Sequence, residues 1–212
     1  MDNTEIPFFN PYLATKESRN RLPHWEQAGS TYFITFHLGD SLPTKVLNRW
    51  RKDRAHWLKE HPKPWDSKTE MTYYHLFARR IDRWLDAGYG ECLLADPRRS
   101  RTLQNVLMFF DGNRCRILST VIMPNHVHLL FVQNPDWPLE VMLHSWKRVS
   151  AREINRQSNR SGSLWQKDYF DRLVRDEGHF LNCVEYIRLN PVRAGLQAGT
   201  YRLYESPLVR QL

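Results

Sequence analysis

The chain has 212 residues, 41% of them hydrophobic, which is enough to bury a core in one domain with elaborations. It has 31 Lys and Arg residues against 23 Asp and Glu, and the net charge of +8 favours a nucleic acid or another anionic partner. The three cysteines lie far apart, with no CxxC pair, which argues against a disulfide framework or a cysteine-ligated zinc and favours a reducing cytoplasm. We expect no signal peptide, because the N-terminus lacks a basic region followed by an apolar stretch, and no membrane span, because no apolar run approaches ~20 residues.

The N-terminal half is expected to combine one strand with several helices. Residues 1–29 are polar and irregular and are predicted to form an arm. Residues 30–38 are rich in aromatic and β-branched side chains, which predicts a strand. Apolar residues recur at helical spacing over 42–60, and helical signals return from about residue 72 to residue 87 after a loop that contains prolines.

The middle of the chain predicts a helix followed by a β-hairpin. The helix is expected over 97–110, with a proline in its first turn. Strands are expected over 114–123 and 126–132, and Pro124 with its neighbour forms the tight break between them.

The C-terminal part predicts a helix over 138–155, a partly extended segment over 165–174 and a last helix. Asp176 is expected to cap this helix, and Asn190 to end it, because the residue before a proline disfavours the helical conformation. The order of elements predicts an α+β fold with an antiparallel sheet.

Two histidines lie on the second strand of the predicted hairpin. Side chains of a strand alternate between its faces, so His126 and His128 share one face and are close enough to bind one metal ion. The alternative is a pair of partly buried histidines that are hydrogen-bonded to their neighbours. A structural zinc site is the weaker interpretation, since neither a cysteine nor a third histidine lies nearby in the sequence.

The stretch "MPNHVHLL" resembles the histidine–hydrophobic–histidine signature of the HUH endonucleases. With Met-Pro-Asn before the pair, it resembles the single-tyrosine transposases of bacterial insertion sequences, and among these the REP-associated tyrosine transposases. The resemblance implies that His126 and His128 hold one divalent cation, Mg²⁺ or Mn²⁺. That cation polarises a DNA phosphate, which a tyrosine on a helix attacks.

The stretch "FLNCVEYIRLNPVRAGL" closely resembles the tyrosine helix of that family. The resemblance implies that Tyr186 is the nucleophile and that Asn190, four residues on and so on the same helix face, is the third metal ligand. Asparagine at this position, where the wider family more often has glutamine, fits the REP-associated branch. The alternative for Tyr186 is a ring packed into the core. Tyr169 is the competing tyrosine, and we interpret it as a packing or DNA-contacting residue.

Basic side chains gather on either side of the proposed tyrosine and before the hairpin. Arg148, Arg152 and Arg156 recur every four residues and form one stripe, which is either a DNA-contacting surface or a solvated helix face. The predicted DNA-binding residues are Lys147, Arg148, Arg152, Arg156, Arg188, Arg193, Arg98, Arg99 and Arg101. Trp25, Trp65 or Trp165 could also stack on single-stranded bases.

These observations lead to a predicted ferredoxin-like α+β sandwich with the histidine pair on its central strand. We expect an arm over 1–29, a transposase domain over 30–199 with a helical insert over about 42–101, and a tail over 200–212. The resemblance extends from about Pro23 to Gly199, and its opening segment, "LPHWEQAGSTYFITFHL", resembles a region that contacts DNA in REP-associated transposases.

The resemblance implies a metal-dependent endonuclease and strand-transferase that acts on single-stranded DNA beside a hairpin, here a repetitive extragenic palindrome. It forms a 5′-phosphotyrosine link, is cytoplasmic and nucleoid-associated, and is either a monomer or a homodimer. Two alternatives stay open. One is a non-catalytic single-stranded nucleic-acid-binding module of ferredoxin-like fold, and the other is a metal phosphoesterase that uses water.

Overall fold

The computed structural model describes residues 5–19, 23–62 and 65–212. In chain order its elements are β1 (Lys16–Arg19), β2 (Pro23–Glu26), β3 (Thr31–His37), α1 (Thr44–Glu60), α2 (Ser67–Tyr73), the π-helical turn η1 (Tyr74–Ala78), α3 (Arg79–Asp86), the 3-10 turn η2 (Leu93–Ala95), α4 (Pro97–Met108), β4 (Cys115–Ile122), β5 (His126–Gln133), α5 (Leu139–Gln157), β6 (Phe170–Leu173), α6 (Glu177–Arg193), β7 (Arg202–Glu205) and α7 (Pro207–Arg210).

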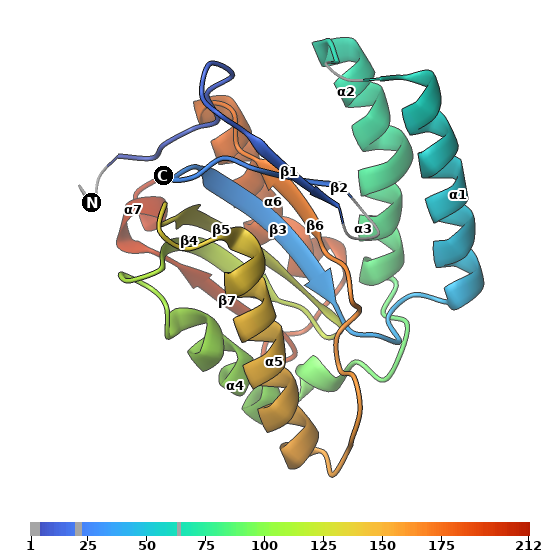
Figure 1. Ribbon diagram of the computed structural model, residues 1–212. Coiled ribbons are helices and arrows are strands. Elements are labelled where there is room, and N and C mark those ends of the chain that lie inside the picture. The colour runs from blue at the N-terminus through green and yellow to red at the C-terminus, as the bar shows by residue number, and fades with distance from the viewer. Residues whose placement is uncertain (1–4, 20–22, 63–64) are drawn as a thin grey trace.

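The main sheet has five antiparallel strands in the order β6-β3-β5-β4-β7 (Figure 1). β5 lies in the middle, and all eight of its residues are buried, as expected for a strand covered on both faces. The strands β3, β4, β5 and β6, together with α4 and α5, have the ferredoxin-like order. The predicted fold and the central position of the histidine strand are therefore confirmed.

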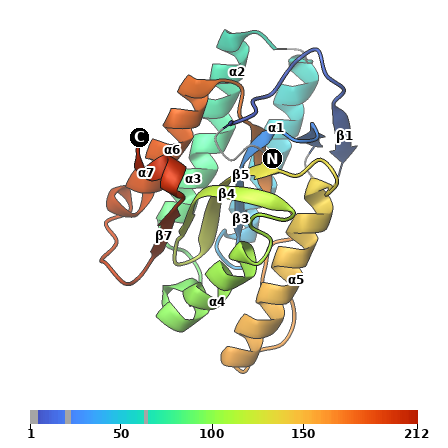
Figure 2. The same cartoon turned by 90° about the vertical axis from the view of Figure 1, so that its left-hand side faces the viewer.

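Helices cover both faces of this sheet (Figure 2). α4 and α5 lie on one face, where Phe131 and Trp146 belong to the larger hydrophobic core. α6 lies on the other face, where Ile187 packs with Phe33 and Leu130 in a second core. Because side chains alternate along β5, its even-numbered residues, the histidines included, face α6.

The helices α1, α2 and α3 are additional to this sandwich. They follow β3 and enclose a third core, in which Trp50 and Phe77 are buried. The predicted helical insert is therefore present, and its helices run from Thr44 to Asp86. α4 covers the sheet, although the sequence prediction placed its first turn within the insert.

Two terminal segments contain structure that the sequence prediction did not assign. The arm includes the antiparallel pair β1–β2. The tail supplies β7, which pairs with β4 at the edge of the sheet, and α7, whose Val209 is buried in the core beneath α6. Pairing of β7 satisfies backbone groups that β4 would otherwise expose.

The last long helix begins as predicted but ends later. Asp176 accepts a hydrogen bond from the backbone N–H of His179 at 2.7 Å, so the predicted cap is confirmed. The predicted end at Asn190 is wrong, because α6 continues through the buried Pro191 to Arg193. Proline removes one backbone hydrogen bond there, and the chain leaves the helix at Gly195, with a φ of +65°.

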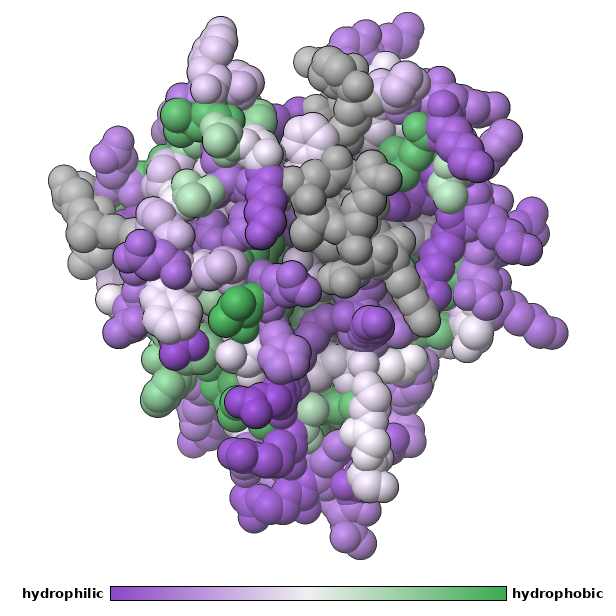
Figure 3. Space-filling model, in the orientation of Figure 1, coloured by the Kyte–Doolittle hydropathy of each residue, from purple (hydrophilic) through white to green (hydrophobic). Residues whose placement is uncertain are grey.

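The outer surface in the view of Figure 3 is mostly hydrophilic, with hydrophobic side chains in small separate patches. Within the described ranges, no helix is both long and apolar enough to span a lipid bilayer.

Candidate active site

The histidine pair lies at the start of β5, on the face that α6 covers. Both side chains are fully buried, and their Nε2 atoms are 3.0 Å apart. Burial lowers the pKa of His128 to about 3, and burial and the neighbouring His128 lower the pKa of His126 well below its ordinary value. Both imidazoles are therefore neutral at physiological pH, which is the form that binds a metal ion.

The opposite ring nitrogens are held by polar partners. His126 Nδ1 lies 2.7 Å from Asn125 Oδ1, and Asn125 Nδ2 donates to the carbonyls of Leu85 and Tyr89. Those two carbonyls fix the orientation of the amide, so His126 Nδ1 carries the proton and its Nε2 presents a lone pair. His128 Nδ1 lies 2.7 Å from Thr35 Oγ1, a hydroxyl that can either donate or accept.

Helix α6 places Tyr186 over the histidine pair. The ring centroids of Tyr186 and His128 are 5.1 Å apart, and the Tyr186 ring meets Phe33 edge to face. The hydroxyl is buried without a well-aligned hydrogen bond to any described residue, while the Asp82 carboxylate lies beside it. Burial raises the pKa of Tyr186 well above its ordinary value, and the charges of Asp82 and Asp86 raise it further.

Asn190 follows one helical turn after Tyr186 on α6 and points to the same site. Its side chain is 1% exposed, and its Oδ1 has no hydrogen-bond donor among the described residues. A buried carbonyl oxygen without a donor is uncommon in a folded protein. α6 lies against the sheet, so Tyr186 and Asn190 are on the sheet face that carries the two histidines.

The sequence analysis missed four residues of this site. Asp82 and Asp86 come from α3, Arg172 from β6, and His37 from β3 opposite His126. Asp86 Oδ1 lies 3.8 Å from His126 Nε2, and its carboxylate contacts the Asn190 amide. Burial raises the pKa of each of the two carboxyls to about 6.

Arg172 and His37 complete the surroundings of the histidine pair. The Arg172 guanidinium lies 4.8 Å from the ring centroids of both Phe33 and Tyr74, and its charge lowers the pKa of Tyr186. His37 Nδ1 lies 2.6 Å from Ser41 Oγ, and burial lowers the His37 pKa to about 4. The alternation of side chains on β3 could have suggested His37, but only the register with β5 brings it beside His126.

The donor set fits a divalent cation. Two ligand atoms that are each about 2.1 Å from one ion and at right angles lie about 3.0 Å apart, which is the separation of the two Nε2 atoms. The unpartnered Asn190 Oδ1 adds an oxygen ligand of the kind that Mg²⁺ and Mn²⁺ prefer. The described residues contain no group of three or more His, Cys, Asp or Glu arranged to hold a metal, so the amide oxygen is needed in this set.

The basic stripe predicted on the helix after the hairpin lies away from this site. It is on α5, which covers the opposite face of the sheet. Arg156 pairs with Glu153 at 3.3 Å and Arg152 with the same carboxylate at 3.0 Å, whereas Arg148 is exposed. Lys147 is turned inward, where its ammonium donates to the carbonyls of residues 166, 167 and 168.

The other predicted DNA-binding arginines are distributed over α4 and α6. Arg98 pairs with Asp96 at 3.2 Å, and Arg99 lies 3.8 Å from the same carboxylate, while Arg101 is exposed. Arg188 pairs with Glu205 of β7 at 2.9 Å, so its position is set by the C-terminal segment. Arg193 is exposed at the end of α6, and its charge lowers the pKa of Asp86.

Aromatic residues outside the site are mainly packing residues. Tyr169, the competing tyrosine, is 5% exposed and belongs to the core beneath α4 and α5, away from the histidines. Trp165 is buried there too and donates to Ser150 Oγ at 3.0 Å. Trp65 packs against Trp57, and Trp25 is half-buried on β2.

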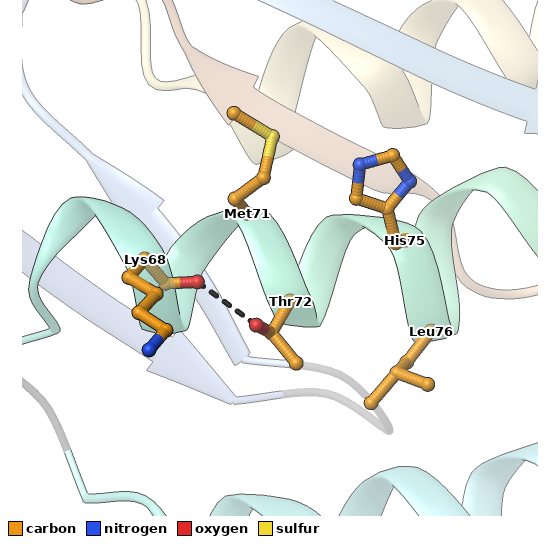
Figure 4. Close-up of a pocket in the computed structure, with 5 residues that line it drawn as sticks. All are labelled: Lys68, Met71, Thr72, His75 and Leu76. Atoms are coloured by element: carbon orange, nitrogen blue, oxygen red, sulfur yellow. Dashed lines mark hydrogen bonds between the residues drawn. The ribbon is translucent and has the colours of Figure 1, made fainter.

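A surface hollow of about 540 Å³ lies on the helical insert, not at the histidines. Its lining residues all come from α2 and η1, namely Lys68, Met71, Thr72, His75 and Leu76 (Figure 4). The Thr72 hydroxyl donates to the Lys68 carbonyl at 2.9 Å, a bond within the helix. None of these residues belongs to the histidine site.

Comparison with known proteins relates this region to transposases. Residues 89–190 match the family model of IS200-like transposases. A Haemophilus influenzae protein named as a REP-associated tyrosine transposase is 30% identical over 84 residues, which cover 35% of this chain and 48% of the relative. A second H. influenzae protein, of no assigned function, is 28% identical over 110 residues, covering 42% and 60% of the two chains. The matches thus span about half the length of these curated relatives.

Two solved structures are also similar at low identity. A REP-associated tyrosine transposase bound to a REP hairpin is 14% identical, with a TM-score of 0.41 over 82% of this chain and 73% of that one. A transposase from Deinococcus radiodurans is 14% identical, with a TM-score of 0.36 over 86% and 95% of the two chains.

Proposed function

We propose that the chain is an IS200-like transposase, a single-tyrosine nuclease and strand-transferase that cuts and rejoins single-stranded DNA, because residues 89–190 match that family model. One observation carries this proposal. Among the described tyrosines, only Tyr186 has a ring that contacts the histidine pair, with its ring centroid 5.1 Å from that of His128. Because one relative is named as REP-associated, we extend the proposal to DNA of the repetitive extragenic palindrome type, cut beside a hairpin as the resemblance in the sequence implies.

The proposed reaction begins with the transfer of the phenolic proton. Because burial keeps Tyr186 protonated, the hydroxyl needs an acceptor, and the Asp82 carboxylate lies beside it. The phenolate oxygen then attacks a DNA phosphorus atom and forms the 5′-phosphotyrosine bond, while the bond to the 3′ oxygen breaks and that oxygen takes up a proton. In the reverse reaction a 3′-hydroxyl attacks the phosphotyrosine and joins two strands.

His126, His128 and Asn190 would hold the divalent cation. When it is bound, this cation supplies Lewis-acid polarisation of the phosphoryl oxygen. Asn125 and Thr35 orient the two imidazoles, and the Arg172 charge favours the phenolate form of Tyr186. All of these groups are buried or half-buried, so the charges act in a site with little screening by water.

A covalent-trapping assay tests the proposal. The protein is mixed with labelled single-stranded hairpin oligonucleotides and Mn²⁺, and the products are separated on a denaturing gel. We expect a slow protein–DNA band that disappears with Tyr186→Phe, with His126→Ala and with EDTA. Tyr169→Phe is the matched control, since Tyr169 lies in the opposite core, and it should retain the band.

The same assay separates the alternatives. A metal phosphoesterase that uses water would cleave without a covalent band and would keep its activity in Tyr186→Phe. A nucleic-acid-binding module would bind the oligonucleotides equally with and without Tyr186 and would cleave none of them.

A further inference from the structure

Arg172 is a cation that aromatic rings hold beside the candidate site. It is on β6, directly opposite Phe33 of β3, and its guanidinium carbon lies 4.8 Å from the ring centroids of both Phe33 and Tyr74. Cation–π contacts use the flat face of a guanidinium and leave the N–H groups, which point outward in its plane, available. The two rings thus hold the cation in place without using its hydrogen-bond donors.

The charge of Arg172 is not paired with a carboxylate in the described part of the chain. The Tyr74 hydroxyl lies beside its N–H groups, and Asp82 acts on it electrostatically without forming an ion pair. Arg188, by comparison, pairs with Glu205 at 2.9 Å. The Arg172 side chain is half-buried, and charges removed from water in this way are usually paired. An anion is therefore the partner that this guanidinium lacks.

The Phe33 ring connects Arg172 to the reacting groups. Its centroid is 5.6 Å from that of the His128 ring and 5.8 Å from that of the Tyr186 ring. Because β3 lies between β6 and β5, Arg172 and His128 approach this ring from the strands on its two sides. A phosphate placed between the histidine pair and Tyr186 is thus separated from the guanidinium by about the width of the Phe33 ring.

The proposed reaction needs a positive charge near Tyr186. Two carboxylates lie near the hydroxyl, and they repel the negative charge of an incoming DNA phosphate. The sequence analysis placed Arg188 and Arg193 among the DNA-binding residues, but Arg188 is already paired, and Arg193 is exposed at the end of α6, two turns after Tyr186. Arg172, in contrast, is a cation whose charge acts on the Tyr186 hydroxyl.

We propose that Arg172 binds a non-bridging oxygen of the DNA phosphate that Tyr186 attacks, and that it keeps this contact in the covalent adduct. This inference rests on the proposed function, since it assigns a further residue to the same site. A guanidinium suits this role better than an ammonium, because its planar N–H groups present two donors in a fixed geometry. The contact offsets the negative charge of the attacked group and leaves its other non-bridging oxygen to the histidine side of the site.

Binding of single-stranded DNA by the unreactive Tyr186→Phe protein tests this contact, with fluorescence anisotropy as the readout. The probes are hairpin oligonucleotides that differ only in the position of one neutral methylphosphonate beside the hairpin. We expect Arg172→Gln, added to this protein, to weaken binding of the unmodified DNA about tenfold. At one position the methylphosphonate should weaken binding when Arg172 is present, and should have little further effect in Arg172→Gln.

Arg172→Lys and Arg49→Gln are the matched controls. Arg172→Lys keeps the charge, so it should lose less affinity and show a reduced methylphosphonate effect at the same position, which decides the question even if the glutamine variant does not fold. Arg49→Gln removes one charge from an exposed position of α1 and should change neither quantity. With Tyr186 intact, Arg172→Gln should slow single-turnover adduct formation about a hundredfold.

Two results would overturn the role of Arg172. One is an equal methylphosphonate effect with arginine, lysine and glutamine at this position, in variants that are folded by circular dichroism. The other is an Arg172-dependent effect at a phosphate other than the one linked to Tyr186 in the trapped adduct. The binding measurement does not require the chemical step. An absent covalent band with an intact Arg172 effect would therefore count against the proposed nuclease and leave Arg172 as a phosphate-binding residue.

Discussion

At the scale of single residues, Asp82 is the proposed acceptor of the proton of the buried Tyr186. The Asp82 carboxylate lies beside the Tyr186 hydroxyl, and burial of both groups favours their neutral forms. We expect Asp82→Asn to slow formation of the covalent adduct about a hundredfold or more, because an amide cannot accept the proton as a base. Single-turnover rates measured with saturating Mn²⁺ check this expectation, and an unchanged rate would exclude Asp82 as the acceptor.

His37 is expected to make the stability of the fold depend on pH. Burial lowers its pKa to about 4 in the folded chain, against about 6.5 when unfolded. Between these values the unfolded chain binds the proton and the folded chain does not, so stability falls as pH falls through this window. At about pH 5 the loss from this residue is about 2 kcal/mol.

The measurement is the difference in unfolding free energy between about pH 7.5 and about pH 5, with and without His37→Gln. The variant should lose less stability than the wild type on acidification, while His56→Gln, at an exposed position on α1, should behave as the wild type. An equal loss of stability in His37→Gln would show that other groups cause the pH dependence. His126 and His128 are such groups, since both are also buried and neutral.

The spacing of the site residues along the chain explains which of them could be predicted from the sequence. His126 and His128 are two residues apart, and Tyr186 and Asn190 four apart, so each pair lies on one face of one element and is visible as a motif. Asp82 and Asp86 are also four apart, but nothing in their own segment indicates that the insert folds back onto β5. That placement depends on Asn125, which binds two carbonyls about 40 positions earlier in the chain.

At the scale of secondary-structure elements, hydrophobic periodicity predicted the sheet strands β3, β4 and β5 and the long helices well, because each buries one or both faces. β7 was not predicted, since only the free edge of β4 gives this short segment a partner. The end of α6 was misplaced because burial of Asn190 and Pro191 outweighs the local preference against helix before proline.

The C-terminal element α7 is expected to stabilise the core beneath α6. Val209 is fully buried there, and the Ser206 N–H donates to the Leu118 carbonyl of β4 at 2.8 Å. We expect Val209→Ala to reduce the free energy of unfolding by about 2 kcal/mol, through lost burial and a residual cavity. Urea unfolding measures this loss, and Leu212→Ala, at a position that is 60% exposed, should leave the stability unchanged.

At the scale of the whole molecule, the net charge is +8, and some of the basic side chains lie on the face opposite the candidate site. The candidate site lies under α6 and α3, whereas the arginine stripe of α5 lies on the opposite face of the sheet. A DNA strand cut at Tyr186 would reach α5 only if the rest of the DNA passed around the edge of the sheet. In the proposed substrate, the hairpin beside the cut would be the part that follows this path.

The salt dependence of DNA binding distinguishes a wrapped path from one confined to the α6 face. If Arg148, Arg152 and Arg156 each contact a phosphate, changing all three to Gln should reduce the slope of log affinity against log salt by about 2 for single strands. The matched control removes three charges from exposed positions of α1, with Lys45, Arg49 and Lys52 changed to Gln. Equal small effects of both triple variants would mean that the stripe acts only through net charge, and that the DNA stays on the face of Tyr186.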